Sequence, residues 1–147
     1  MTDAQRIQIE GQALLLFDGV CGLCNRTVRT FLKRDRRGVL LYIPLQSELA
    51  GEILARFGIH TFPDGLILVT HALTADERLH HRTDAVAQAL RLVGGAWSAL
   101  GGLILLFPRF LRESVYGVVA RNRYRLFGRY DACPVPTLAE RSRILGL

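Results

Sequence analysis

The sequence has few cysteines and almost no lysine. The first shortage excludes one class of protein, and the second affects how the arginines are interpreted. Three unevenly placed cysteines in 147 residues are too few for a small domain held together by disulfides. Lys33 is the single lysine among nineteen basic residues, a bias consistent with genome-wide codon usage that weakens a functional interpretation of each arginine. Because 50% of the residues are hydrophobic, the chain is expected to form one domain with its own core.

The N-terminal segment also lacks the features of a secretory signal. Residues 1–17 contain neither a long apolar region with a positive flank nor a small-residue cleavage site. We therefore expect a cytoplasmic protein. In a reducing compartment, two cysteines spaced CxxC are more often catalytic or metal-binding than a structural disulfide.

The positive charge is concentrated near the C-terminus. Residues 109–147 contain eight arginines and three acidic residues, so residues 1–108 carry only about +1 of the net charge of +6. An arginine-rich surface attracts nucleic acid or anionic lipid, but no signature of a nucleic-acid-binding module accompanies it. We therefore expect solvated helix faces and no nucleic-acid partner.

Hydrophobic periodicity predicts alternating strands and helices. The expected strands are 13–17, 39–43, 66–69 and 77–81, and the expected helices are 21–36, 47–57 and 83–93. Short links in the first half predict parallel strands joined by a right-handed crossover, and the second half predicts an antiparallel pair. This order is typical of a thioredoxin-like α/β fold with a mixed sheet.

Additional helices are expected at the C-terminus. We predict a polar tail at 1–12, a thioredoxin-like core at 13–93 and a helical extension at 94–147 that packs on the core within a single domain. The uncharged stretch 92–107 is short for a membrane span and contains four glycines, which favours a buried or capping helix. A helix at 110–127 follows. Because that segment is basic, peripheral membrane contact remains an alternative that is not favoured.

Two cysteines follow the first predicted strand. Cys21 and Cys24 open a helix, where they lie one turn apart on one face and can reach disulfide distance. The free amides and positive dipole end of the first turn favour a thiolate. We expect a thiol-disulfide oxidoreductase in which Cys21, the more exposed and more acidic thiol, attacks a substrate disulfide and Cys24 resolves the mixed disulfide.

A zinc site is the competing interpretation of the CxxC pair. The other candidate ligands are neither in a second CxxC nor in an HxxxH pair; they are Cys133, His60, His71, His80 and His81. Asn25 rather than histidine follows Cys24, which excludes c-type haem attachment. We therefore expect no metal and no organic cofactor. The alternative function is a non-catalytic binding or membrane-associated module whose cysteines are structural or bind zinc.

Three further residues are candidates for the site. Asp18 ends the first strand, where it can shape the loop or, as an unpaired half-buried carboxylate, exchange a proton with Cys24. Pro63 precedes the third strand, where thioredoxin-like folds often place a cis proline against the CxxC, although a plain turn fits equally well. Cys133 is either a small buried hydrophobe or a third redox thiol, if the tail folds back over Cys21.

The stretch Asp18-Gly19-Val20-Cys21-Gly22-Leu23-Cys24 after a hydrophobic strand resembles the DCC family of predicted thiol-disulfide oxidoreductases, named for its DxxCxxC pattern. Tyr116 and residues 120–128 and 131–134 look like that family's C-terminal signature, so the resemblance covers roughly residues 13–145.

The resemblance implies a thioredoxin-like fold, with redox chemistry at Cys21 and Cys24 assisted by Asp18. It also implies that the Arg-Asn-Arg-Tyr-Arg run and Cys133 pack near the dithiol and shape a site for an anionic substrate. That substrate is expected to be a thiol or disulfide, either a protein or a small molecule. Replacing Arg123 or Arg125 with alanine should then slow substrate reduction without shifting the thiol pKa. No tryptophan precedes Cys21, so thioredoxin's own partner surface is not expected.

Overall fold

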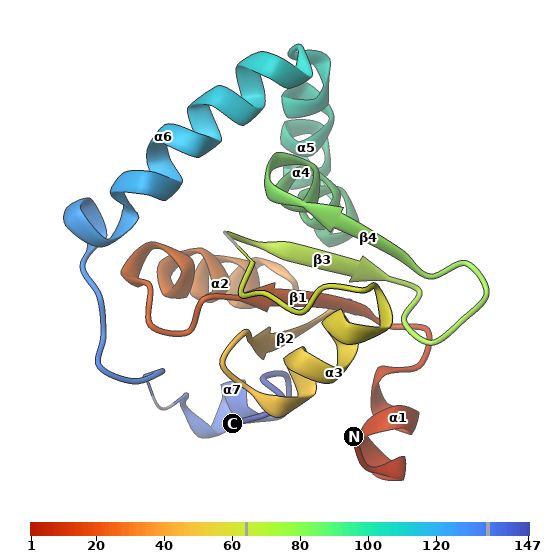
Figure 1. Ribbon diagram of the computed structural model, residues 1–147. Coiled ribbons are helices and arrows are strands. Elements are labelled where there is room, and N and C mark those ends of the chain that lie inside the picture. Colours follow the sequence, from red (N-terminus) through yellow and green to blue (C-terminus); the bar gives the residue numbers. More distant parts are fainter. Residues whose placement is uncertain (64, 135) are drawn as a thin grey trace.

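A four-stranded mixed sheet forms the centre of the protein (Figure 1). The computed structural model describes residues 1–63, 65–134 and 136–147. Its strands are β1 (Ala13–Phe17), β2 (Leu40–Pro44), β3 (Ile67–Thr70) and β4 (Arg78–His81). They are arranged in the order β2-β1-β3-β4, with β1 parallel to β2 and antiparallel to β3, and β3 antiparallel to β4. This architecture confirms the predicted α/β fold class.

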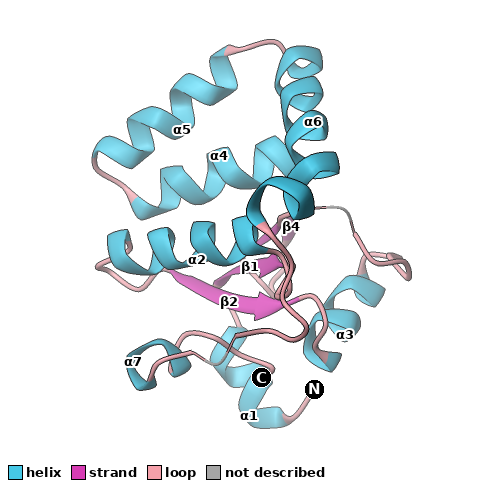
Figure 2. Ribbon diagram, turned by 90° about the vertical axis from the view of Figure 1, so that its left-hand side faces the viewer, coloured by secondary structure: helices cyan, strands magenta, loops and turns pink. Residues whose placement is uncertain are grey.

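Helices cover both faces of the sheet, as Figure 2 shows. They are α1 (Asp3–Ile9), α2 (Gly22–Arg34), α3 (Glu48–Arg56) and α4 (Arg82–Val93). The alternating side chains of β1 face opposite layers: Leu15 and Phe17 pack with α2 and α4, whereas Leu14 and Leu16 pack with α1 and α3. All four side chains are almost fully buried, which explains the continuous apolar run in the sequence.

The N-terminal segment is a helix rather than the predicted polar tail. Thr2 Oγ1 accepts from the Gln5 backbone N–H at 3.2 Å, and Gln5 Oε1 accepts from the Thr2 backbone N–H at 2.8 Å. This capping box starts α1, and the fully buried side chain of Ile9 anchors its end. With a single buried apolar residue, the segment has no periodicity by which the sequence could have predicted a helix.

Two C-terminal helices, α5 (Ala96–Leu106) and α6 (Arg109–Phe127), project beyond the sheet. A Cβ at Gly101 of α5 would lie only 2.5 Å from the Ala87 carbonyl oxygen of α4, so the two helices pack closely there. Of the two predicted positions, buried or capping, α5 takes the capping one, because Leu103 is 52% and Leu106 is 80% exposed. Among the described helices, none has the length and apolar character needed to cross a membrane.

The end of the chain closes the free edge of β2, beyond the short helix α7 (Leu138–Arg141). The Tyr42 backbone N–H donates to the Arg143 carbonyl at 2.8 Å, and the Leu145 N–H donates to the Tyr42 carbonyl at 2.8 Å. The Arg143 guanidinium pairs with Asp35, a buried carboxylate between α2 and β2. The C-terminus is therefore fixed beside the sheet.

Candidate active site

Cys21 and Cys24 lie at the start of α2, directly after the loop that leaves β1. Cys21 is the N-cap residue, and its Sγ accepts a hydrogen bond from the Cys24 backbone N–H at 3.4 Å. The sulfur thus takes the position that a serine or aspartate oxygen occupies at other helix starts. The predicted position of the pair between strand and helix is confirmed.

The burial of the two thiols differs from the prediction. The residue expected to be more exposed, Cys21, is fully buried, whereas Cys24 is 5% exposed. Cys24 borders a cavity of about 170 Å³ between α2 and α6. It is therefore Cys24, rather than Cys21, that contacts an open space in this structure.

A segment from the far end of the chain covers Cys21. The Gly22 backbone N–H donates to the Gly128 carbonyl at 3.1 Å, and the Tyr130 N–H donates to the Val20 carbonyl at 2.7 Å. A Cβ at Gly22 would lie 2.0 Å from the Phe127 carbonyl oxygen, so only glycine allows this approach. We call residues 127–130 the covering segment.

The environment of Cys24 favours its protonated form. Burial is the largest of the effects that raise the pKa of the Cys24 thiol far above its ordinary value. A hydrogen bond with the Cys21 side chain and the negative charges of Cys21 and Asp18 raise this pKa further, while the Asp18 backbone N–H opposes them. Cys24 is consequently a thiol at neutral pH.

Asp18 is fully buried and has several partners, which corrects the prediction of an unpaired, half-buried carboxylate. Its Oδ1 accepts from the Val20 N–H at 3.2 Å, forming the expected local turn, and from Gln46 Nε2 at 2.7 Å. Its Oδ2 accepts a short hydrogen bond from the Tyr124 hydroxyl and lies 3.6 Å from Arg123 Nη2. The carboxylate therefore connects the dithiol loop to β2 and α6.

Two residues that the sequence analysis did not identify hold the loop in place. Gln46 Oε1 accepts from the Gly19 backbone N–H at 2.9 Å. Asn25 Nδ2 donates to the Gly19 carbonyl at 2.7 Å and to the Cys21 carbonyl at 2.9 Å. Gln46 follows β2, and the carboxyl ends of parallel strands meet at one edge of a sheet. Its position in the sequence could therefore have predicted that Gln46 lies near the loop after β1.

Of the two arginines proposed for the site, only Arg123 reaches it. Arg123 is 8% exposed, and its guanidinium lies 4.7 Å from the centroid of the Tyr124 ring as well as beside Asp18. Arg125 is exposed on the outer side of α6.

Cys133 lies beside the dithiol loop, where the tail folds back as the resemblance implies. A Cβ at Gly19 would lie 3.0 Å from Cys133 Sγ. Partial burial and the charge of Asp18 raise the pKa of the Cys133 thiol. Burial and the charge of Asp18 thus raise the pKa of both Cys133 and Cys24.

Pro63 occupies a hollow of its own with Leu45, Leu54 and Ile59. The peptide bond before it is trans, so the cis proline suggested by its position in the sequence is not present. Gly65 and Leu66, in contrast, border the cavity at Cys24. Within the described part of the chain, no group of three or more His, Cys, Asp or Glu side chains is arranged to hold a metal.

Comparison with known proteins gives a consistent set of similarities. Residues 15–129 match the family model described as DCC1-like thiol-disulfide oxidoreductase. The chain is 33% identical over 133 residues to the uncharacterized protein YuxK of Bacillus subtilis (strain 168), covering 90% of this chain and 93% of YuxK. It is 34% identical over 120 residues to a chloroplastic DCC family protein of Arabidopsis thaliana, covering 82% of this chain and 67% of that protein. No solved structure matches the chain significantly.

Proposed function

This chain belongs to the DCC1-like thiol-disulfide oxidoreductase family, and we propose that Cys21 and Cys24 form the redox pair through which it exchanges electrons with a thiol or disulfide substrate. The observation that carries the proposal is the placement of both sulfurs at the start of α2, where the Cys24 backbone N–H donates to Cys21 Sγ. Helix amides and dipole stabilise a thiolate at this position.

The two cysteines have different roles in the proposed reaction. In the reducing direction, the Cys21 thiolate attacks one sulfur of a substrate disulfide, the substrate S–S bond breaks, and the departing thiolate takes up a proton. Cys24 then loses its proton, attacks the Cys21 sulfur and releases the second substrate thiol. Two electrons pass to the substrate and a Cys21–Cys24 disulfide remains; oxidation of dithiols follows the same steps in reverse.

This assignment is supported by the protonation of Cys24. A thiol whose pKa is raised by burial and by a neighbouring negative charge does not compete as the first nucleophile at neutral pH. Once Cys21 is bound in a mixed disulfide, its charge is gone and that part of the pKa shift disappears. Cys24 then becomes easier to ionise at the moment when it must attack.

Asp18 is proposed to accept the Cys24 proton during resolution. The charge of Asp18 raises the pKa of Cys24 and its backbone N–H lowers it, and this coupling supports the proposed role. Arg123 and Tyr124 are proposed as positioning residues that hold this carboxylate. Because the covering segment buries Cys21, the first attack also requires residues 127–130 to move aside.

The test is a mixed-disulfide trap in a Cys133→Ser background, with 2-hydroxyethyl disulfide as probe and mass spectrometry as readout. The Cys24→Ser variant should retain the probe on Cys21, and the matched Cys21→Ser variant should retain none. Stable trapping on Cys24 alone would reverse the two roles. A protein in which neither cysteine reacts with any disulfide would reject the redox function.

A further inference from the structure

An apolar groove runs between α2, α4, α5 and α6, and we call it the helical groove. It consists of three neighbouring cavities of about 360, 170 and 430 Å³, of which the first and third are each within the size range of small-molecule sites. Adjoining cavities share their walls: Thr27 and Val86 border the first two, Tyr116 and Val119 the second and third, and Ile104 the first and third.

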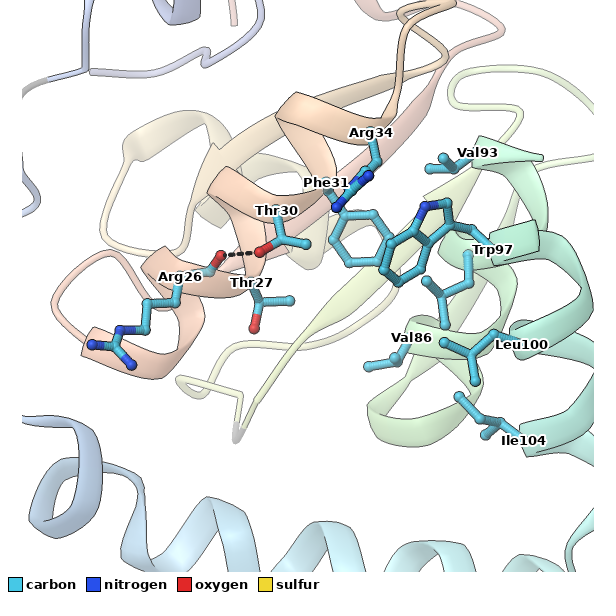
Figure 3. A pocket seen from close by; sticks show the side chains of 11 residues that line it. Arg26, Thr27, Thr30, Phe31, Arg34, Val86, Val93, Trp97, Leu100 and Ile104 are labelled. Carbon is cyan, nitrogen blue, oxygen red and sulfur yellow. Dashed lines mark hydrogen bonds between the residues drawn. The ribbon is translucent and has the colours of Figure 1, made fainter. Parts of the chain in front are cut away.

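The groove leads from an aromatic end to the redox pair. Figure 3 shows its first cavity, which is lined by the side chains of Phe31, Trp97 and Leu100. At the other end lies Cys24, whose backbone N–H donates to Cys21 Sγ at 3.4 Å. A molecule in the groove would therefore have one end at the sulfurs.

The polar groups of the wall are already engaged within the protein. The Thr27 hydroxyl donates to the Leu23 carbonyl at 2.9 Å, and the Thr30 hydroxyl donates to the Arg26 carbonyl at 2.9 Å (Figure 3). The Tyr116 hydroxyl accepts from the Leu66 N–H at 2.9 Å. An extended peptide in this groove would find few partners for its N–H and C=O groups, whereas an alkyl chain needs none.

The charges near the groove are also neutralised or kept at its rim. Carboxylates of the same chain pair with the nearby arginines: Arg82 with Glu113 at 2.8 Å, Arg112 with Asp84 at 2.7 Å, and Arg123 with Asp18 at 3.6 Å. Arg34 lies at the rim with its guanidinium 5.4 Å from the Trp97 ring centroid, and Arg26 is exposed. The interior therefore favours an uncharged, apolar occupant.

We propose that the helical groove binds the aliphatic chain of a small-molecule disulfide or thiol, and so selects the substrate of the redox pair. This inference rests on the proposed function of Cys21 and Cys24. The disulfide lies at the Cys24 end, and its unbranched alkyl chain extends toward Trp97. The reduced protein gives two electrons to the substrate, whose S–S bond breaks as two thiols leave and the Cys21–Cys24 disulfide forms.

The test is a single-turnover reaction of the pre-reduced protein with ethyl, butyl, hexyl and octyl 2-pyridyl disulfides. Release of 2-thiopyridone gives the second-order rate constant, and the reaction of each probe with dithiothreitol corrects for its intrinsic reactivity. We expect the corrected rate constant to rise about two- to fourfold per methylene until the chain fills the groove. The short, polar 2-hydroxyethyl 2-pyridyl disulfide measures the redox pair without the groove.

A matched pair of variants separates the groove from the surface of α5. Ile104 lines two of the cavities, so Ile104→Trp puts a larger ring into the groove. Leu103→Trp adds the same ring at a neighbouring position that is 52% exposed. Ile104→Trp should flatten the chain-length series, whereas Leu103→Trp should change neither that series nor the 2-hydroxyethyl rate.

Three outcomes overturn the inference. A flat series in the wild-type protein with a normal 2-hydroxyethyl rate rejects the groove as an alkyl site and leaves the redox function standing. Equal effects of Ile104→Trp and Leu103→Trp on the chain-length series also reject the groove as an alkyl site. A flat series together with faster reduction of a protein disulfide would assign the groove to a polypeptide, and failure to react with every probe would reject the proposed function itself.

Discussion

Arg123 Nη2 lies 3.6 Å from Asp18 Oδ2, and both side chains are buried. This pair joins α6 to the loop that carries Cys21, two segments at opposite ends of the chain. A buried charge that keeps its partner is tolerated, but one that loses it is costly. The pair therefore explains structurally why the Asp18 motif and the arginine-rich C-terminal motif form one site.

Replacing Arg123 with methionine should destabilise the protein by on the order of 3 kcal/mol, because it leaves the Asp18 carboxylate buried without its cation. Arg125→Met, two residues along the same helix, should stay within about 0.5 kcal/mol of wild type because Arg125 is exposed. Urea unfolding of the reduced protein measures both values. Equal effects at the two positions would show that Arg123 is not the structural partner of Asp18.

The double variant Asp18→Asn/Arg123→Met checks the cause of that loss. Removing both charges should cost less than the sum of the two single changes, because no unpaired charge remains. Arg123 would then act by holding Asp18 in position, rather than by shaping the substrate site together with Arg125 as the resemblance implies. A strictly additive cycle would contradict the pairing.

Gly22→Ala should displace the covering segment and expose Cys21. The added Cβ would meet the Phe127 carbonyl oxygen at 2.0 Å, and a backbone atom cannot move aside as a flexible side chain can. We expect a loss of stability on the order of 2 kcal/mol and faster alkylation of Cys21 by iodoacetamide, located by mass spectrometry.

Gly51→Ala is the matched control for that change. Gly51 lies in α3 with no atom within 4 Å of its added Cβ, so alanine there should leave Cys21 alkylation unchanged and raise stability by up to about 1 kcal/mol. If Gly22→Ala also left the alkylation of Cys21 unchanged, residues 127–130 would not limit access to this thiol.

Much of the fold could be predicted because hydrophobic periodicity reflects what each segment buries. The strand predicted at 13–17 is Ala13–Phe17, and the helix predicted at 83–93 is Arg82–Val93. For α5, which is apolar on all sides, the sequence left a buried and a capping position open. Such a pattern does not reveal that only the Gly101 side has a neighbour and that Leu106 faces solvent.

The site was predictable where it depends on local geometry and not where distant segments meet. The DxxCxxC spacing was sufficient to place Cys21 at a helix start. Its burial was not predictable, because the covering segment comes from the opposite end of the chain. Arg123 and Arg125 look equivalent in sequence, yet two residues on a helix face nearly opposite sides, so only one is buried.

The raised pKa of Cys24 predicts that the reduced protein loses stability at alkaline pH. In the unfolded chain this thiol ionises near its ordinary value of 9.0, while in the folded protein it stays protonated to much higher pH. Its contribution is therefore complete below pH 9 and declines as pH rises above it, by about 1.4 kcal/mol per pH unit.

Cys24→Ala should remove that part of the alkaline slope, as measured by urea unfolding at a series of pH values in reducing buffer. Cys21→Ala should lower the pKa of Cys24 because it removes both a hydrogen bond and a negative charge, although burial still keeps this pKa above the ordinary value. The pH dependence of Cys24 alkylation reports the shift directly. An upward shift would contradict the assigned causes.

Tyr42 and Tyr124 should respond in opposite directions to the same loss of a hydroxyl group. Tyr42 is fully buried, and its hydroxyl has no hydrogen-bond partner among the described residues, so Tyr42→Phe should stabilise the protein by about 1 kcal/mol. The ring keeps its contact with the Arg143 guanidinium, 5.4 Å from the ring centroid. Tyr124→Phe removes the donor to Asp18 and should cost about 2 kcal/mol. Thermal unfolding of both variants measures the difference, and a destabilising Tyr42→Phe would mean that a bound water satisfies that hydroxyl in solution.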